Sequence, residues 1–243
     1  MAQNPYPNFA LRDNNLSITT HEQRLLQEIR DRFDTNEVAQ QYRAKKNIVT
    51  SRNLREWRCI EKALHGVGSG AAVLDLPCGS GRLEPLLEKR GYRVTAADSS
   101  HHMLDQAIDS YLSASGNSRL PIHMRFIQQN VMQTTFAENE FDAVICNRLL
   151  HHFPTPDLRR MALIELARIS NGVVIISFFS NFAFSALRFH LKNHLANRQP
   201  TDRVPIWFQV LEKDLAAAGL QCTGTFPVRR GLSPQTYLRL EKI

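Results

Sequence analysis

An apolar strand that runs into a glycine-rich turn constrains this chain more than any other feature. Residues 73–76 read Val-Leu-Asp-Leu, and residues 77–83 continue as Pro-Cys-Gly-Ser-Gly-Arg-Leu. Glycine has no Cβ, so its backbone can approach a bound molecule closely. Asp98 ends the next predicted strand, at a distance from Gly81 that suits one helix and one strand. A carboxylate there suits a ribose diol, which predicts a nucleoside-bearing cofactor.

Dehydrogenases and methyltransferases share this arrangement, and Glu84 distinguishes between the two classes. The nicotinamide-binding fingerprint has a third glycine at this position, so a dehydrogenase is disfavoured. Residues 75–81 resemble instead the first motif of the class I S-adenosylmethionine-dependent methyltransferases, Asp-x-Gly-Cys-Gly-x-Gly, at all but one position. That position is Pro77, which has no N–H to donate and fixes φ near about −65°. The resemblance implies S-adenosylmethionine as cofactor, and it is strongest to small-molecule enzymes such as the ubiquinone, menaquinone and sugar O-methyltransferases.

Strands and helices alternate after this turn, which is typical of an α/β fold with a parallel sheet between two layers of helices. The apolar runs of the first five predicted strands are continuous, so we expect these five strands to be buried on both faces. The resemblance implies a Rossmann-like three-layer sandwich with a mostly parallel seven-stranded sheet. The predicted strands are 73–76, 92–97, 124–128, 141–146, 173–178, 222–226 and 236–240, and the predicted helices between them are 81–90, 100–112, 157–170 and 206–218.

Helices predicted over 21–33 and 51–64 precede the first strand. We interpret residues 1–66 as an N-terminal helical extension over the cofactor and substrate cleft, and residues 67–243 as the methyltransferase domain. A helical cap insertion is expected at about 181–205. Residues 181–198 of this insertion are basic and amphipathic. Such a helix either packs on the domain as a lid or makes peripheral contact with an anionic membrane or an apolar substrate.

The bulk composition excludes several classes of protein. Four cysteines without metal-ligand spacing favour reduced thiols, no disulfide framework and no metal. No export signal or membrane span is apparent, so we expect a cytoplasmic protein. The net charge of +7 lies in the flanks, because residues 1–66 carry 11 basic and 8 acidic side chains and residues 181–243 carry 9 and 4. Basic flanks of this kind attract an acidic substrate, a nucleic acid or an anionic membrane surface. The alternative is ordinary charge that is exposed to solvent.

The resemblance also assigns residues to the cofactor. Asp98 would bind the ribose, and Asn130 stands where the family usually has an aspartate for the adenine amine; a local turn is its alternative role. Met103 would cover the adenine or belong to the core, and Arg52 would pair with the cofactor carboxylate or stay exposed. The predicted cofactor-binding residues are Arg52, Asp75, Cys78, Gly79, Gly81, Asp98, Ser99, Met103, Asn130, Val131, Asn147 and Leu149.

Residues 146–153, Cys-Asn-Arg-Leu-Leu-His-His-Phe, follow the fourth parallel strand. In some sugar O-methyltransferases a histidine pair at this place is proposed to deprotonate the acceptor. An imidazole with a pKa near about 6.5 can take a hydroxyl proton at neutral pH. We therefore predict His151 and His152 as catalytic residues, with His151 preferred as the base, and packing or capping as the alternative.

These observations favour methyl transfer to an oxygen or nitrogen of a small-molecule acceptor. Two other functions stay open at this point. An RNA methyltransferase would use the basic flanks, although no separate RNA-binding module is visible. A non-catalytic binding protein would keep the cofactor fold for assembly with a partner.

Overall fold

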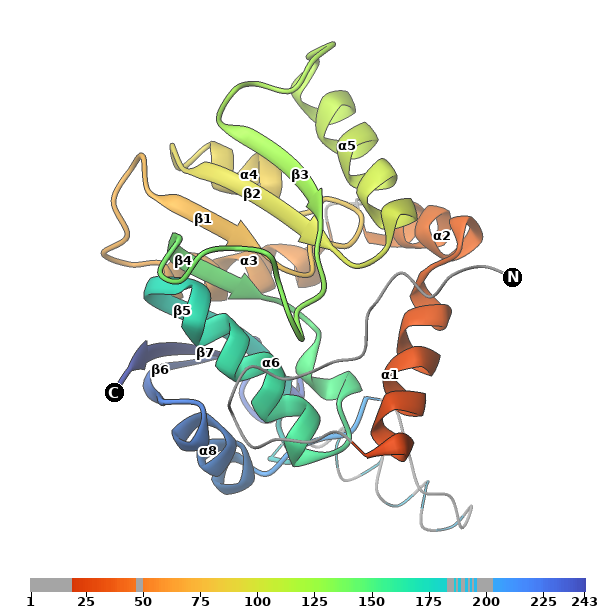
Figure 1. Ribbon diagram of the computed structural model, residues 1–243, viewed down its shortest axis with the longest axis vertical. Helices are drawn as coiled ribbons and strands as arrows, with labels where there is room; N and C mark the ends of the chain where they lie inside the picture. The colour runs from red at the N-terminus through yellow and green to blue at the C-terminus, as the bar shows by residue number, and fades with distance from the viewer. Residues whose placement is uncertain are drawn as a thin grey trace.

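The computed structural model describes residues 19–46, 50–182 and 203–243, and five positions between 186 and 195. Its strands form one seven-stranded sheet in the order β3-β2-β1-β4-β5-β7-β6 (Figure 1). The first five strands are parallel, and β7 runs antiparallel to both β5 and β6. The predicted mostly parallel seven-stranded sheet is thus confirmed. The strands are β1 Ala72–Asp75, β2 Arg93–Asp98, β3 Met124–Gln128, β4 Phe141–Cys146, β5 Ser170–Phe179, β6 Leu220–Pro227 and β7 Gln235–Lys242.

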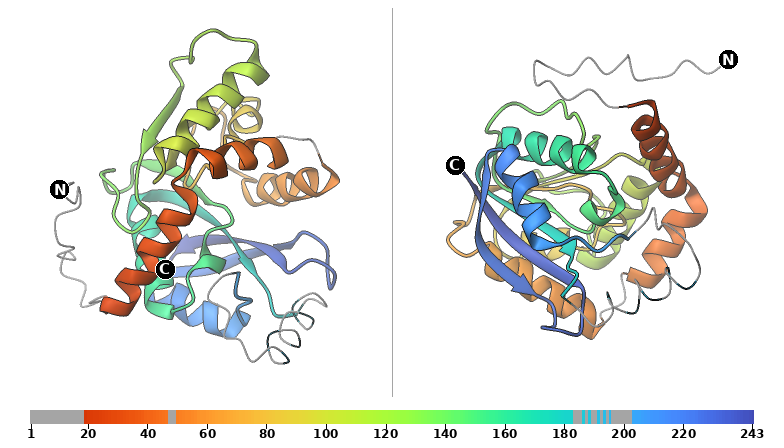
Figure 2. Two further views of the ribbon diagram at one scale, coloured as in Figure 1. Left: turned by 90° about the vertical axis from the view of Figure 1, so that its right-hand side faces the viewer. Right: turned by 90° about the horizontal axis from the view of Figure 1, so that it is seen from below.

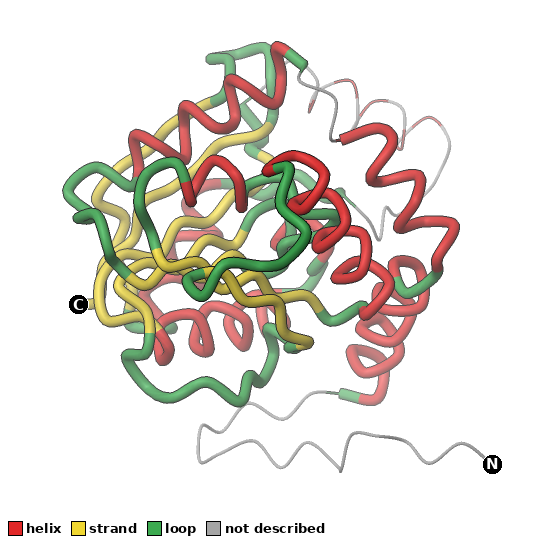
Figure 3. The backbone as a smooth tube through the Cα atoms, turned by 90° about the horizontal axis from the view of Figure 1, so that it is seen from above, coloured by secondary structure: helices red, strands yellow, loops and turns green. Residues whose placement is uncertain are grey.

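Helices cover both faces of the sheet (Figure 3). The helices α6 and α8 pack on one face, and α3, α4 and α5 pack on the other; α3 and α6 lie on opposite sides in the right-hand view of Figure 2. The helices are α1 Thr20–Phe33, α2 Asn36–Lys46, α3 Ser51–Ala63, α4 Glu84–Glu88, α5 His101–Ser115, α6 Pro156–Ile169 and α8 Phe208–Ala217, with a short 3₁₀ turn, η1, at Leu150–His152.

The central strands are buried on both faces because successive side chains point in opposite directions. Val73 and Ile145 belong to the apolar cluster on the α3 side, whereas Leu74 and Val144 belong to the cluster on the α6 side. The expected burial on both faces is wrong for β3, where Arg125 and Gln128 are exposed. The reason is that β3 is an edge strand, with β2 as its one neighbour in the described sheet.

Two helices differ from the sequence predictions, and the predicted cap lies mostly outside the described residues. The helix α4 begins at Glu84 rather than residue 81, because Gly81 has a φ of +77°, which a right-handed helix cannot accommodate. The helix α2 was not predicted, since Ala39 is its one fully buried described residue and gives no apolar stripe. Most of the predicted cap at 181–205 falls outside the described residues, although positions 186, 188, 191, 193 and 195 are helical.

The helices α1 and α2 lie on the side to which the parallel strands β1 and β2 point (Figure 1). Thr19 caps α1 in a reciprocal arrangement with Glu22, and Glu22 also accepts a hydrogen bond of 2.7 Å from Thr155, the N-cap of α6. This contact fixes α1 beside the turn that follows β4. The extension proposed for residues 1–66 remains a prediction. Within the described chain, no helix is both long and apolar enough to span a bilayer.

Candidate functional site

Asp98 lies directly beside the glycine turn. Its Oδ2 accepts from the N–H of Gly79 at 2.9 Å, and its Oδ1 accepts from the N–H of Ser100 at 3.0 Å. Only 7% of Asp98 is exposed. The two strand ends that carry the turn and the carboxylate are neighbours in the sheet, so the juxtaposition inferred from spacing is present in the structure.

The main-chain N–H groups of Cys78, Gly79 and Gly81 donate within the protein, and their predicted contact with a cofactor remains a prediction. The N–H of Cys78 donates to the carbonyl of Ala97 at 2.8 Å, and that of Gly81 to the carbonyl of Cys78 at 3.4 Å. Buried donors need such partners, and here the end of β2 and the turn itself supply them. The turn leaves space for a ligand, because a Cβ placed on Gly79 would meet no atom within 4 Å. The Leu76–Pro77 peptide bond in this turn is cis.

Substitution of the two turn glycines should have different effects. Both have positive φ, so alanine strains either position by about 1–2 kcal/mol. At Gly81 the added Cβ would also lie 2.7 Å from the Cα of Ala107 in α5, which should cost about 1–3 kcal/mol more. Urea denaturation should therefore show a larger loss of stability in Gly81→Ala than in Gly79→Ala. Equal losses would contradict this packing argument.

Three buried carboxyl groups converge around the turn. Burial raises the pKa of Glu84 to about 7 and that of Asp98 to about 6, and it raises the pKa of Asp75 well above its ordinary value. The Asp75 Oδ1 and both Glu84 oxygens have no hydrogen-bond partner among the described residues. A bound cation would favour the ionised forms of these carboxyl groups, and S-adenosylmethionine carries positive charge on its sulfur and its amino group. The site therefore fits the expected cofactor.

These carboxyl groups should make the cofactor-free protein less stable as the pH rises. Their folded pKa values exceed the unfolded ones, so the folded state binds more protons between about pH 4 and pH 7, and the free energy of unfolding falls through that window. Glu84→Gln should raise stability at neutral pH and flatten this slope. Urea denaturation across the window tests it, with exposed Glu138→Gln as control. A Glu84→Gln slope as steep as wild type would contradict the assignment.

The residues predicted to surround the adenine are partly engaged elsewhere. The amide oxygen of Asn130 accepts from the N–H of Met132 at 3.0 Å, so it forms the local turn considered as its alternative role. Met103 and Val131 are buried in the protein core. The carbonyl of Ser99 accepts from the Gln128 side chain at 2.8 Å. Their predicted contacts with a cofactor remain predictions.

Asn147 and Arg148 connect the end of β4 to the neighbouring strands. The Asn147 Oδ1 accepts from the Tyr237 hydroxyl at 2.9 Å and from Ser177 at 3.3 Å. Arg148 has a φ of +59°, which is uncommon for a residue other than glycine, and its N–H donates to the Ser177 hydroxyl at 2.7 Å. The backbone then passes Leu149 and enters η1.

His151 and His152 form a packed aromatic stack rather than a pair of exposed rings. The His151 ring lies parallel to that of Phe179 at 4.1 Å between centroids and 4.2 Å from that of His152. The His152 ring in turn meets Phe33 of α1 edge-on at 5.2 Å. Both histidines are more than nine-tenths buried. The histidine pair thus packs against α1. The catalytic role of the pair remains a prediction.

Glu56 is a central residue that sequence reasoning missed. Its carboxylate is fully buried and accepts from Arg82 at 2.8 Å, from Arg52 at 3.1 Å and from Arg148. Burial alone would raise the pKa of Glu56, but the guanidinium groups of Arg148 and Arg82 hold it below its ordinary value. We call Arg52, Glu56, Arg82 and Arg148 the arginine cluster. It joins α3 to the glycine turn and to the end of β4.

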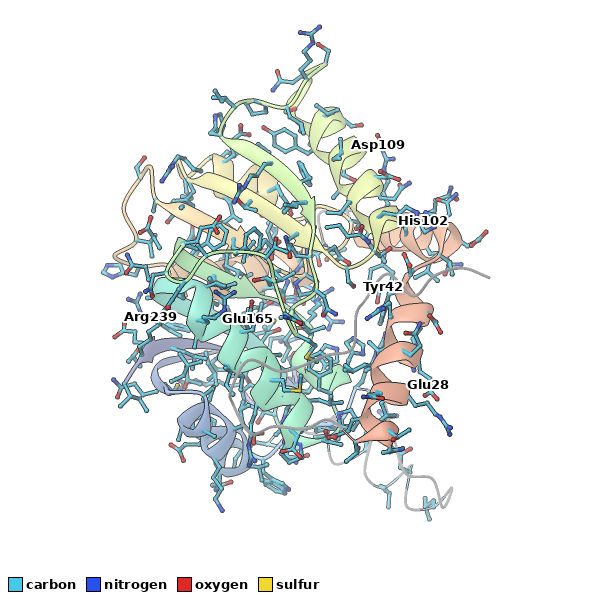
Figure 4. All side chains as sticks on the ribbon, viewed as in Figure 1. Glu28, Tyr42, His102, Asp109, Glu165 and Arg239 are labelled. Atoms are coloured by element: carbon cyan, nitrogen blue, oxygen red, sulfur yellow. The ribbon has the colours of Figure 1, made fainter. Side chains whose placement is uncertain are left out.

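Asp34, His101 and His102 place possible metal-ligand atoms within 4.8 Å of one another. His102 lies at the start of α5, next to α2 (Figure 4). No metal was predicted, because the four cysteines show no ligand spacing, and Asp34 lies far from His101 and His102 in the sequence.

Comparisons with known proteins agree with this geometry. A methyltransferase domain family matches residues 73–171. A demethylmenaquinone methyltransferase from Renibacterium salmoninarum is 27% identical over 71% of this chain and 68% of its own length. A ubiquinone biosynthesis O-methyltransferase from Coxiella burnetii is 29% identical over 52% of this chain and 47% of its own length. The matched segment thus spans about two thirds of the first relative and about half of the second.

A solved structure shares the fold. Magnesium protoporphyrin IX methyltransferase from Synechocystis PCC 6803, crystallised with bound S-adenosylhomocysteine, superposes with a TM-score of 0.68 at 17% identity. The match covers 90% of this chain and 100% of that one.

Proposed function

Since this chain belongs to the class I S-adenosylmethionine-dependent methyltransferases, we propose that it methylates an oxygen or nitrogen atom of a small molecule. The observation that carries the proposal is Asp98, held against the Gly79 backbone at the open turn after β1. S-adenosylmethionine supplies an electrophilic methyl group on a sulfonium, so the protein's task is mainly to bind and orient.

The residues of this chain then have distinct roles. Asp98 accepts from the ribose hydroxyls with the lone pairs that Gly79 and Ser100 leave available. Gly79 leaves room for the cofactor, and Arg52, whose side chain is 58% exposed, pairs with its carboxylate. Asn130 keeps a second lone pair for the adenine amine. The acceptor approaches the end of β4, where the histidine pair lies.

His151 serves as the proton acceptor for a hydroxyl nucleophile. Its ring is held between Phe179 and His152, so its orientation is fixed before the acceptor arrives. A hydroxyl is therefore the acceptor group that this site suits best. Quinol or phenol acceptors have such a group, and the quinone-pathway names of the two curated relatives support testing them first.

Isothermal titration with S-adenosylhomocysteine tests the cofactor part of this proposal. We expect saturable binding with a Kd well below about 1 mM, and no heat at that concentration would overturn the proposal. Release of S-adenosylhomocysteine from S-adenosylmethionine, measured against a panel of quinols, phenols and amines, tests the transfer. Cofactor binding without turnover on any member would favour the non-catalytic alternative.

His151→Phe should lower turnover while cofactor binding is kept. Phenylalanine preserves the stack on Phe179 but cannot accept a proton, so kcat with a hydroxyl acceptor should fall by about 10²–10⁴-fold. The affinity for S-adenosylhomocysteine should change by less than about threefold. His152→Phe is the matched control. If His152→Phe loses the rate and His151→Phe keeps it, the base is His152.

A further inference from the structure

A cavity of about 410 Å³ lies between α3 and the end of β6, away from the glycine turn. On α3, Arg55, Arg58 and Lys62 are spaced so that they project from one side of the helix. Arg230, in the turn between β6 and β7, lines the cavity with them. The two basic flanks of the sequence therefore meet at this place. The lining residues are Arg55, Arg58, Cys59, Lys62, Thr225, Phe226, Pro227, Val228 and Arg230.

The charge of this cavity is uncompensated. Its nine described lining residues include four cations and no carboxylate. Within the part of the chain that the structure describes, none of these four cations forms a salt bridge, whereas the arginines at 82, 148 and 159 all pair with buried acids. The Nε of Arg55 is buried and has no hydrogen-bond partner among the described residues. Arg55 is half-buried, whereas Arg58, Lys62 and Arg230 are exposed, so an anion that binds among the four cations would offset a like-charge repulsion that water only partly screens.

The arrangement suits phosphate better than a single carboxylate. A guanidinium presents a planar fork of donors that matches phosphate oxygens, and three such forks with one ammonium can neutralise more than one negative charge. Beside the cations lies an apolar wall of Phe226, Pro227 and Val228. Gly224 leaves room for this wall, because a Cβ there would stand 3.0 Å from the Phe226 ring. The wall can contact the carbon part of a ligand.

We propose that this cavity binds a small phosphate-bearing molecule through Arg55, Arg58, Lys62 and Arg230. The site shares no described residue with the arginine cluster or the histidine pair, so it goes beyond the proposed methyl transfer and does not depend on it. It nevertheless lies on the same helix as Glu56, which follows Arg55 directly.

Titration of the full chain with inorganic pyrophosphate, at constant ionic strength, tests this proposal. We expect saturable shifts of arginine Nε–H resonances in ¹⁵N-labelled protein, with a Kd of about 1 mM or lower. Arg55→Gln/Arg230→Gln should weaken binding at least about tenfold. The matched control is Arg93→Gln/Arg125→Gln, which removes the same charge from β2 and β3. Equal weakening in both double variants, or no saturation, would overturn the proposal.

Two further measurements distinguish a small phosphate ligand from a membrane surface or an RNA. Sedimentation with vesicles of phosphatidylcholine and phosphatidylglycerol, and binding of a single-stranded RNA oligonucleotide, should both be unaffected by Arg55→Gln/Arg230→Gln. A membrane or RNA interaction that this variant abolishes, without saturable pyrophosphate binding, would overturn the small-molecule assignment. The variant should bind S-adenosylhomocysteine as wild type does. If wild type itself fails to bind that cofactor, the proposed function fails while the pyrophosphate result stands.

Discussion

Asp98→Asn should lower the affinity for S-adenosylhomocysteine by at least about a hundredfold. Each hydrogen bond to a charged group contributes about 1.5–3 kcal/mol, and loss of about 2.7 kcal/mol is a hundredfold. The substitution also turns an amide N–H₂ toward the N–H of Gly79 or Ser100, because the carboxylate accepts from both. Two N–H donors that face each other displace the substituted side chain. The substitution therefore distorts the turn and also removes the carboxylate charge.

Isothermal titration measures this loss, and Asp109→Asn is the matched control. Asp109 lies on α5 with its side chain 59% exposed and forms a surface ion pair with Arg43, so its substitution should leave cofactor affinity unchanged (Figure 4). Because burial raises the pKa of Asp98 to about 6, wild-type affinity should also fall as the pH is lowered through that value. A change of less than about threefold in Asp98→Asn would show that this carboxylate does not bind the ribose.

Local patterns predicted the scaffold of this site accurately. The ranges 124–128 and 141–146 match β3 and β4, because each short segment contains adjacent apolar residues and lies next to turn residues. The position of Asp98 beside Gly79 follows from the same kind of information, since adjacent parallel strands bring their carboxyl ends together. Periodicity and spacing suffice wherever the relevant partners are consecutive elements of one sheet.

Side-chain partnerships between distant segments could not be predicted in this way. Glu56 contacts Arg82 and Arg148, which lie 26 and 92 positions further along the chain, and no local pattern links them. Asn130 shows that a matching motif position does not determine the partner of a side chain. Its position corresponds to the family motif, but its amide oxygen accepts a hydrogen bond from its own loop. The direction of a polar side chain depends on which donors reach it first, and this information is present only in the folded chain.

Glu56→Gln should destabilise the fold and weaken the cofactor site together. Removal of the charge leaves three guanidinium groups around a neutral amide, and loss of one partner from a buried ion pair costs about 3–5 kcal/mol. Arg82 follows Gly81 directly and Arg148 follows Asn147, so both ends of the site lose an anchor. We expect S-adenosylhomocysteine affinity to fall by about tenfold, measured by titration beside urea denaturation.

Glu165→Gln separates stability from site geometry. Glu165 is another buried acid, paired with Arg168 and Thr134 on α6 and the loop after β3, away from the arginine cluster. Its loss should lower stability without changing cofactor affinity. The contribution of Glu56 to stability should depend on pH. The folded pKa of Glu56 is lowered, so its stabilisation of the fold is present above about pH 4.5 and is lost as the pH falls through the folded pKa. If Glu56→Gln behaves as Glu165→Gln does in both assays, the arginine cluster supports the fold alone and does not position the methyl-transfer site.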